Sequence, residues 1–377
     1  MIEAEPGGAV LPTSLPVSGE DAIAGAFLDL DLAETAGATE PEDARAIVEA
    51  VRAVVRKRFE RARRGEVRPS PSGDRAVRDA HPKILGLCKA VVTVPPGVPA
   101  GLAHGVFRPG ARYDAFVRFS NGASEIQPDA ARDGRGMAIK LCKVDGARLP
   151  SEEQATQDFV LIDHPVFFVR DTHDYRELVA AIRAGGQRSF FVRFWPPRVR
   201  WRELWNVLRV QKKPASVLCQ TFHSMTPLRL GPHVVKLRVR PLGRALPAPA
   251  EATAENRLAA ALAAHLAKEP ARFAIEVQVR KPDMPVEDAT ICWSARESPF
   301  EPVAELELPV QRPDTAARLA FGDRLSFSPW HGLAEHRPLG SLNRLRRIVY
   351  AAIAAERRGL NAQAVPPPFE PTGSEQV

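Results

Sequence analysis

The chain has 377 residues, of which 45% are hydrophobic and 26% are charged, a composition typical of a soluble globular protein. This length fits one large domain or two of average size. The sequence has no run of about eighteen apolar residues, so a transmembrane helix is not expected, and its first residues lack the basic and apolar regions of a signal peptide.

The chain is basic, with a net charge of +7 and a pI of about 9.5. Its basic residues are spread out and form no helix-turn-helix, zinc-finger or RNA-binding signature, so we expect no nucleic-acid partner. The four cysteines are widely separated, which argues against a zinc site and a disulfide framework. Together with the absent signal peptide, they indicate a reducing cytoplasm.

The two ends of the chain differ in composition from its middle. Residues 1–38 are rich in Gly, Pro, Ala and acidic side chains, and they predict a flexible N-terminal arm with a short helix over 20–34. Residues 362–377 predict an extended, proline-rich tail. The intervening residues 39–361 are expected to form a single domain.

Periodic apolar residues predict several helices in this domain. The segment from Pro41 to Arg64 begins with acidic and ends with basic side chains, which complements the helix dipole. Residues 198–213 are strongly basic and have Trp201 and Trp205 on one face. This pattern fits either a helix docked on the domain through these tryptophans or a helix on a lipid surface. Further helices are expected over residues 173–184, 252–267 and 341–360.

Short β-branched or aromatic runs bounded by turn residues predict the strands of the domain. They cover residues 89–94, 115–119, 136–142, 158–162, 219–222, 234–239, 273–280, 290–293 and 303–308. Short strands at this spacing favour an antiparallel barrel over a parallel sheet.

Two stretches near the centre of the chain have unusual patterns. The run from Arg132 to Gly136 has three charges just before an apolar strand, which favours a tight turn in which Gly136 supplies backbone freedom. Residues 165–169, Pro-Val-Phe-Phe-Val, offer a flat aromatic wall.

Two further stretches come earlier in the chain, Arg78-x-x-His81-x-Lys83 and Arg118-Phe119-Ser120-Asn121. The four stretches, in their order along the chain, resemble the haem catalase superfamily. The likeness covers roughly residues 75–345 and is closest to the shorter, catalase-related bacterial proteins. The resemblance implies an α+β fold: a catalase-like antiparallel β-barrel with peripheral helices and a haem-sized cavity.

His81 and Ser120 match the family's distal histidine and the serine that orients it. Heterolytic cleavage of a peroxide O–O bond requires a group that takes a proton from one oxygen and delivers it to the other, as a neutral imidazole does. The resemblance therefore implies that His81 is the catalytic acid and base and that Ser120 orients it. The alternative is a core or surface histidine without a catalytic role.

The resemblance also implies how a haem b cofactor would be held. Arg78 and Arg118 match positions that pair with the haem propionates, because buried carboxylates need charge-assisted partners. Ordinary salt bridges are the alternative for these arginines. Phe167 and Tyr175 match aromatic residues against the haem face, although core packing explains Phe167 equally well.

The sequence departs from the family at the distal asparagine, which lies in an Asn-Asn-Thr-Pro stretch. The matching residues here are Ile162-Asp163-His164-Pro165, so Ile162 stands at the asparagine position and cannot bond to peroxide. Asp163, one residue away, is a candidate to substitute for it as a catalytic residue.

The second departure is at the proximal iron ligand. Classical catalases use a tyrosinate here, but residues 324–340 contain no tyrosine, and the matching positions are Ser328 or Trp330. Three alternatives stay open: a substitute metal ligand, for which we name His331, no haem at all, or Tyr350 reaching in from its helix.

The expected function is that of a haem-dependent oxidoreductase acting on hydrogen peroxide or an organic hydroperoxide, fatty-acid hydroperoxides included. The alternative is a non-enzymatic catalase-like barrel that binds haem or a lipid. Peripheral membrane contact and homo-oligomerisation are left open by the sequence.

Overall fold

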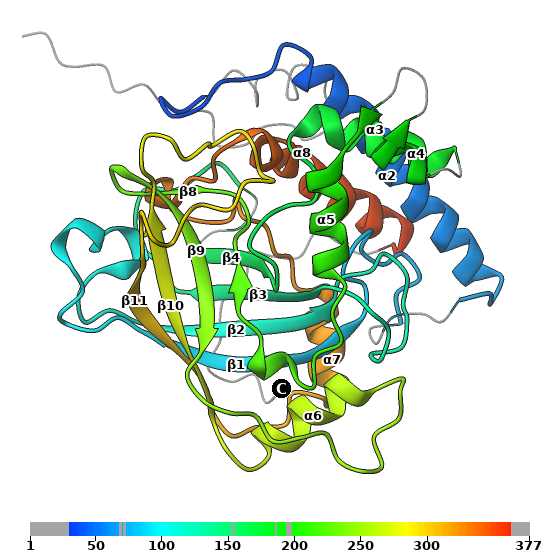
Figure 1. Cartoon of the computed structure of the whole chain (residues 1–377). Coiled ribbons are helices and arrows are strands. Elements are labelled where there is room, and N and C mark those ends of the chain that lie inside the picture. Colours follow the sequence, from blue (N-terminus) through cyan, green and yellow to red (C-terminus); the bar gives the residue numbers. More distant parts are fainter. Residues whose placement is uncertain are drawn as a thin grey trace, which may run out of the picture.

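The structure is a computed structural model that describes residues 30–67, 70, 73–151, 153, 155–184, 187–193 and 198–362 (Figure 1). The strands of its main sheet are β1 (Ile84–Thr93), β2 (Arg112–Asn121), β3 (Arg135–Cys142), β4 (Thr156–Ile162), β7 (Phe222–His223), β8 (Leu228–Leu230), β9 (His233–Pro241), β10 (Ala271–Val279) and β11 (Phe300–Leu308). Eight of them close an antiparallel barrel in the order β10-β11-β1-β2-β3-β4-β7-β9, because β9 pairs again with β10. Strand β8 extends the sheet beyond β9. The predicted antiparallel barrel is confirmed.

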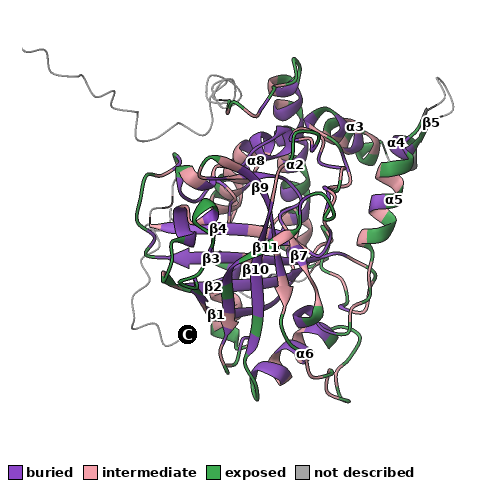
Figure 2. Ribbon diagram, turned by 60° about the vertical axis from the view of Figure 1, so that its left-hand side comes forward, coloured by how far each residue is buried: buried purple, intermediate pink, exposed green. Residues whose placement is uncertain are grey.

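Side chains from alternate strand positions fill the inside of the barrel. Phe119 on β2 faces Met137 on β3, and both belong to the main apolar core, as does Phe159 on β4. Successive side chains of a strand point to opposite faces. The residues between these core positions therefore point outward, toward the helices. Figure 2 shows that the barrel strands are largely buried.

Helices cover the outside of the barrel. They are α2 (Glu40–Arg63), α3 (Thr172–Arg183), α4 (Gln187–Phe191), α5 (Trp201–Val210), α6 (Arg257–Leu266), α7 (Ala316–Arg324) and α8 (Ser341–Leu360), and a two-stranded ribbon of β5 (Val192–Arg193) and β6 (Arg198–Val199) lies beside α4. Side chains of α2, α3, α4 and α8 form a second apolar cluster beside the barrel (Figure 1). None of the helices in the described part of the chain is long and apolar enough to cross a membrane.

The helices predicted between residues 41 and 360 are present with somewhat different bounds, but some other expectations were wrong. Residues 219–222 are mostly not a strand, since Val217–Cys219 is a 3-10 helix and the strand is Phe222–His223. Residues 290–293 are not a strand: Thr290 bonds to Asp288 and the Trp293 indole donates to the carbonyl of Pro285, so local side-chain bonds replace a strand ladder. Helix α5 docks through its aliphatic side chains, whereas Trp201 and Trp205 face solvent.

Helix α7 was not predicted. Its start carries a capping signal, since the Thr315 hydroxyl accepts a hydrogen bond from the backbone N–H of Arg318. Only Gly322 and Asp323 of this helix are buried, so its sequence lacks the repeating apolar positions that predict a helix.

Most of the expected N-terminal arm and proline-rich tail lies outside the described residues. In the part that is described, residues 30–34 are not helical, and Asp31 forms a salt bridge with Arg229. Glu34 is buried and bonds to Arg344.

Arg344 fixes the start of helix α8. Its side chain is 1% exposed and forms salt bridges to Glu34 at 2.6 Å, Glu40 at 2.8 Å and Glu287 at 2.9 Å. Burial favours the neutral guanidine, but the hydrogen bonds to Glu40 and Glu287 outweigh it and raise the pKa of Arg344. The cluster therefore ties α8 to α2 and sets the position of the residues that α8 turns toward the barrel.

Candidate functional site

A cavity of about 1520 Å³ lies between the outer wall of the barrel and helix α8. Its barrel wall includes alternate, outward-facing positions of three adjacent strands, namely Arg118 and Ser120 on β2, Gly136 and Ala138 on β3, and Val160 and Ile162 on β4. Other walls come from residues 78–81, residues 324–328 and α8. Ligand pockets commonly have about 300–1000 Å³, so this cavity can hold a large planar or lipid-like molecule.

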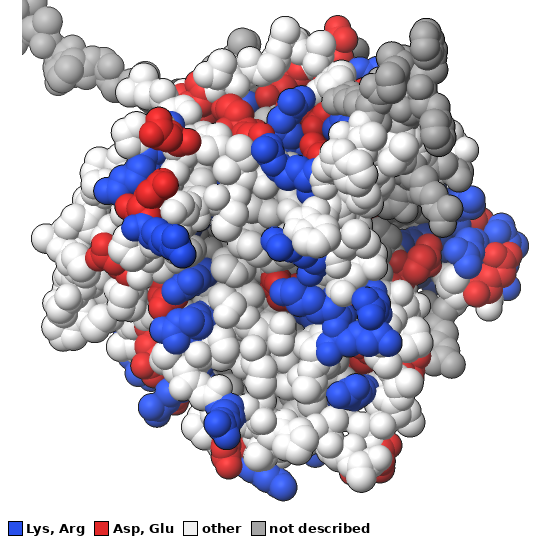
Figure 3. Space-filling model, in the orientation of Figure 1, with Lys and Arg blue, Asp and Glu red and all other residues white. Residues whose placement is uncertain are grey.

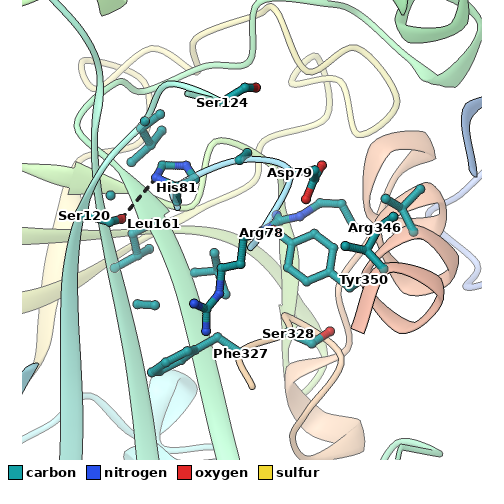
Figure 4. Close-up of a pocket in the computed structure, with 18 of the residues that line it drawn as sticks. Arg78, Asp79, His81, Ser120, Ser124, Leu161, Phe327, Ser328, Arg346 and Tyr350 are labelled. Atoms are coloured by element: carbon teal, nitrogen blue, oxygen red, sulfur yellow. Dashed lines mark hydrogen bonds between the residues drawn. The ribbon is translucent and has the colours of Figure 1, made fainter. Parts of the chain in front are cut away.

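His81 and Ser120 meet at the barrel wall of this cavity. The His81 Nδ1 lies 3.1 Å from the Ser120 Oγ (Figure 4). A φ of 57° at His81 turns the chain sharply before β1 begins. Burial, assisted by the positive charge of Arg118, lowers the pKa of His81 to about 4. At neutral pH the ring is therefore uncharged, with one nitrogen held by the serine.

Gly136 makes the room that this pair occupies. It faces Ser120 in the β2–β3 ladder. A β-carbon at Gly136 would lie 2.7 Å from the His81 Nδ1 and 2.8 Å from the Ser120 Oγ, closer than carbon atoms approach such groups. A side chain at this position would therefore push the imidazole or the hydroxyl out of place.

Three guanidinium groups lie along the cavity, of which Arg118 is buried and Arg78 and Arg357 are partly buried. Arg118 donates to the carbonyl of His81 at 3.0 Å, and its buried Nε has no hydrogen-bond partner among the residues that the structure describes. Arg78 forms a salt bridge with the buried Asp323 at 3.2 Å. Burial, assisted by repulsion between the cations, lowers the pKa of Arg78 to about 9 and that of Arg357 to about 10. An anionic group bound here would offset both effects.

Tyr350 and Arg346 lie on α8 and line the cavity from the other side. The Tyr350 hydroxyl accepts a hydrogen bond of 2.9 Å from the Arg346 guanidinium, whose centre lies 5.1 Å from the phenol ring centroid. Figure 4 shows the His81 imidazole on the barrel side of the cavity and the Tyr350 phenol on the α8 side. A charge-assisted hydrogen bond stabilises negative charge on a phenol oxygen.

His331, named as the substitute metal ligand, also lines the cavity. Its Nδ1 lies 3.1 Å from the buried Asp158 carboxylate, which also pairs with Lys140 at 2.8 Å. Only the other ring nitrogen is thus left for a ligand. The neighbouring Trp330 donates its indole N–H to the carbonyl of Asn343 at 2.8 Å, so this polar atom is occupied within the protein.

Asp163 is not among the residues that line this cavity in the described part of the chain. It is 1% exposed, one of its carboxylate oxygens accepts a hydrogen bond from the backbone N–H of Arg135 at 2.8 Å, and burial raises its pKa. Ile162, at the family's asparagine position, does line the cavity. The structure therefore offers an aliphatic side chain where the resemblance would have an amide.

Phe167 and Tyr175 both line the cavity. The ring of Phe167 stacks on Phe168 with a centroid distance of 4.6 Å, and its centroid is 6.4 Å from that of Tyr175. Burial raises the pKa of Tyr175. These rings give the cavity an apolar aromatic wall next to its charged one.

The sequence alone left Tyr350 as one of three alternatives and gave no role to Arg346, Asp323 or Arg357. A signal was present, since Arg346 and Tyr350 are four residues apart and therefore share one face of a predicted helix. Arg357 follows seven residues after Tyr350 on the same face. Asp323 had no such signal, because its partner Arg78 is distant in the sequence.

Comparisons with known proteins find catalases among the proteins of similar fold. The family model for catalase matches residues 101–197. A search of curated proteins finds no match. Solved structures with a similar fold include a fungal catalase, with a TM-score of 0.53 and 17% identity over 79% of this chain and 65% of that one.

Two further catalases have similar folds. A bacterial catalase has a TM-score of 0.55 and 18% identity over 80% of this chain and 63% of its own. Catalase A from Saccharomyces cerevisiae has a TM-score of 0.56 and 16% identity over 76% and 61%. The chain thus spans less than two thirds of the length of each of the three. The predicted resemblance of the fold is confirmed: the chain has a catalase-like fold, and the catalase family model matches part of its sequence.

Proposed function

We propose that this chain is a haem-dependent oxidoreductase of the catalase or peroxidase type that acts on hydrogen peroxide or an organic hydroperoxide, including those of fatty acids. One observation carries the proposal: an imidazole held by a hydroxyl and a phenol held by a guanidinium line the same cavity. The His81–Ser120 and Tyr350–Arg346 pairs both place polar side chains on the cavity wall, where they could contact a bound ligand.

The cavity residues fit a haem. The Tyr350 oxygen is the iron ligand that we favour, because a phenolate is an established haem ligand and Arg346 supports its negative charge. His331 stays a second candidate, because the Asp158 contact at Nδ1 would orient its ring and leave Nε2 for a metal. The guanidinium groups of Arg78 and Arg118 would pair with the propionates, and the unpartnered Nε of Arg118 offers a donor for one of them. Haem would supply the redox centre that peroxide chemistry needs.

The protein groups then divide the proton transfer. Neutral His81 would take the proton from one peroxide oxygen and return it to the other as the O–O bond breaks. The Ser120 hydroxyl fixes the ring orientation for both steps. Ile162 offers no hydrogen bond to the peroxide, so we expect slower turnover of hydrogen peroxide than in an enzyme with an amide there. The apolar side chain suits a larger, apolar hydroperoxide.

The test is to purify the protein with added haem and to record the Soret band and peroxide turnover. We expect stoichiometric haem in the native chain, loss of turnover with retained haem in His81→Ala, and an altered or lost Soret band in Tyr350→Phe. Tyr113→Phe is the matched control, because Tyr113 lies on β2 outside the cavity lining and should leave both readouts unchanged. Full turnover in His81→Ala would refute the assignment of the acid and base.

The second candidate function is a non-enzymatic barrel that binds haem or a lipid. The aliphatic Ile162 at the distal wall and the position of Asp163 outside the cavity lining favour it, because the distal side then carries one hydrogen-bonding group fewer. Stoichiometric haem without peroxide turnover, or extraction of a lipid with the purified protein, would support this alternative.

The setting of the protein follows from the same features. We propose a cytoplasmic protein, because all four cysteines are free thiols in the structure. We expect peroxides rather than nucleic acids as partners, and a homo-oligomer is to be tested by light scattering.

A further inference from the structure

Helix α5 exposes large apolar side chains on one face. Trp201, Trp205 and Leu208 are 71%, 56% and 55% exposed. Residues four and seven positions apart lie on one helix face, so the three form a single apolar stripe. Leaving such a group in water is unfavourable, and exposed apolar clusters commonly mark interaction surfaces.

The opposite face of α5 already has its packing partners. Leu204 and Val207 pack on the second apolar cluster, and Val207 and Val210 line the cavity. The buried Asn206 amide donates to the carbonyl of Phe167 at 3.3 Å. The helix is therefore held without its tryptophans, which are free for another surface.

Basic side chains surround the exposed stripe. The segment from Arg198 to Lys213 has six Lys or Arg residues. Of these, Arg202 is exposed on the helix, whereas Arg200 is buried and pairs with Asp174 and Glu177. Arg209 is exposed and lies over the Trp205 ring at 4.9 Å, while Lys213 is exposed just beyond the helix. Figure 3 shows Lys and Arg side chains gathered over this part of the molecule.

We propose that the Trp201–Leu208 face of α5 docks on an anionic lipid membrane. Tryptophan prefers the boundary between water and hydrocarbon, and an amphipathic helix with a basic border lies in that plane. Each Lys or Arg near an anionic leaflet adds attraction. Bulk water would solvate the cations of this face but leave the tryptophans exposed to solvent. A neutral apolar partner would cover the tryptophans but would not attract the cations. The proposal concerns this surface alone and does not depend on haem or on peroxide turnover.

The position of this face relative to the cavity gives the docking a consequence. Val207 and Val210 line the cavity from the inner side of the helix whose outer side carries the tryptophans. A helix is about 10 Å wide, so a docked bilayer would lie about that distance from the cavity lining. Apolar molecules dissolved in the bilayer would then be close to the cavity.

The experiment is a flotation assay of the full chain with two kinds of vesicle, phosphatidylcholine alone and phosphatidylcholine with one third phosphatidylglycerol. We expect binding to the anionic vesicles that weakens as salt rises. The Trp201→Ala/Trp205→Ala and Arg209→Glu/Lys213→Glu double variants should each bind at least about tenfold more weakly. Leu242→Ala/Val310→Ala is the matched control, since both side chains are exposed apolar groups elsewhere, 47% and 55% exposed.

Each variant is first checked by circular dichroism and thermal unfolding for an unchanged fold. Quenching of tryptophan fluorescence by brominated lipid, present in the native chain and reduced in the tryptophan variant, provides a second measurement. Absence of binding to anionic vesicles, or equal loss in the control variant, overturns the proposal. A native dimer that becomes monomeric when Trp201 and Trp205 are replaced, without vesicle binding, would assign the stripe to a second copy of the chain instead.

Discussion

Replacing Gly136 with alanine should disturb the His81–Ser120 pair more than its size suggests. The added methyl group would lie 2.7 Å from the His81 Nδ1 and 2.8 Å from the Ser120 Oγ, and both atoms belong to residues that the barrel ladder or a sharp turn holds in place. Overpacking of this kind costs about 1–3 kcal/mol. We expect a loss of stability in this range and, if His81 is the acid and base, a fall in turnover of about 10²-fold.

The assay combines urea unfolding with peroxide turnover of the haem-loaded protein. Gly97→Ala is the matched control, because a β-carbon there meets no atom within 4 Å. The double variant Gly136→Ala/His81→Ala tests whether the clash with the imidazole causes the loss of stability. Removing the imidazole relieves this contact, so Gly136→Ala should destabilise the His81→Ala protein less than it destabilises the native protein. Unchanged stability and turnover in Gly136→Ala, or losses that simply add in the double variant, would refute the reasoning.

Three further predictions follow from buried charge. Arg344→Met leaves Glu34, Glu40 and Glu287 without their shared cation and should destabilise the protein by about 3–5 kcal/mol in urea unfolding; a change below about 1 kcal/mol would contradict this. Burial lowers the pKa values of His81 and His164 to about 4 and those of His223 and His336 to about 3. Between pH 6.5 and about 4 the unfolded chain therefore binds protons that the folded chain does not. The free energy of unfolding should decrease by about 1.4 kcal/mol for each imidazole and each unit by which the pH is lowered in this range. Urea midpoints that do not change with pH would refute this prediction. Peroxide turnover should be constant near neutral pH and fall as the pH approaches about 4, where His81 gains its proton; a fall centred near the ordinary histidine pKa of 6.5 would contradict burial of this ring.

The strands of the barrel could be predicted because their signal is local. Runs such as residues 136–142 and 158–162 are β-branched or aromatic and are bounded by turn residues, so their type follows from short stretches of sequence. The contact between His81 and Ser120 was also predictable, from the resemblance, and the hydrogen bond is present. The segment 290–293, wrongly predicted as a strand, has a similar composition. Its Thr290 backbone N–H and Trp293 indole N–H donate instead to the Asp288 carboxylate and the Pro285 carbonyl.

The position of Tyr350 in the cavity lining could not be read from a short stretch of sequence. Matching one segment to the family's ligand motif led to residues 324–340, whereas the phenol that lines the cavity comes from the next helix. Which face of α8 meets the cavity depends on the packing of α8 on α2 and on the Arg344 cluster. These contacts join residues about three hundred positions apart, and no local period encodes them.

Strand geometry explains why Asp163 is a poor substitute for the residue at position 162. The two residues are neighbours at the end of β4, where successive side chains point to opposite faces. Ile162 faces the cavity, so the next side chain turns away from it, and Asp163 instead bonds to the backbone of Arg135. A one-residue shift in a strand thus changes the side of the sheet, however similar the chemistry of the two positions is.

The packed interior of the barrel explains how the two halves of the site are held. Phe119 and Phe159 belong to the apolar core that fills the barrel, and the cavity lies where the strands meet α8. His81 and Ser120 are then fixed by the strand ladder, and Tyr350 is fixed by the docking of α8 through Arg344. Weakening the Arg344 cluster should therefore move the phenol before it disturbs the imidazole. Haem binding should be more sensitive than barrel stability to changes at Glu34 and Glu40, because those carboxylates hold the helix and not the strands.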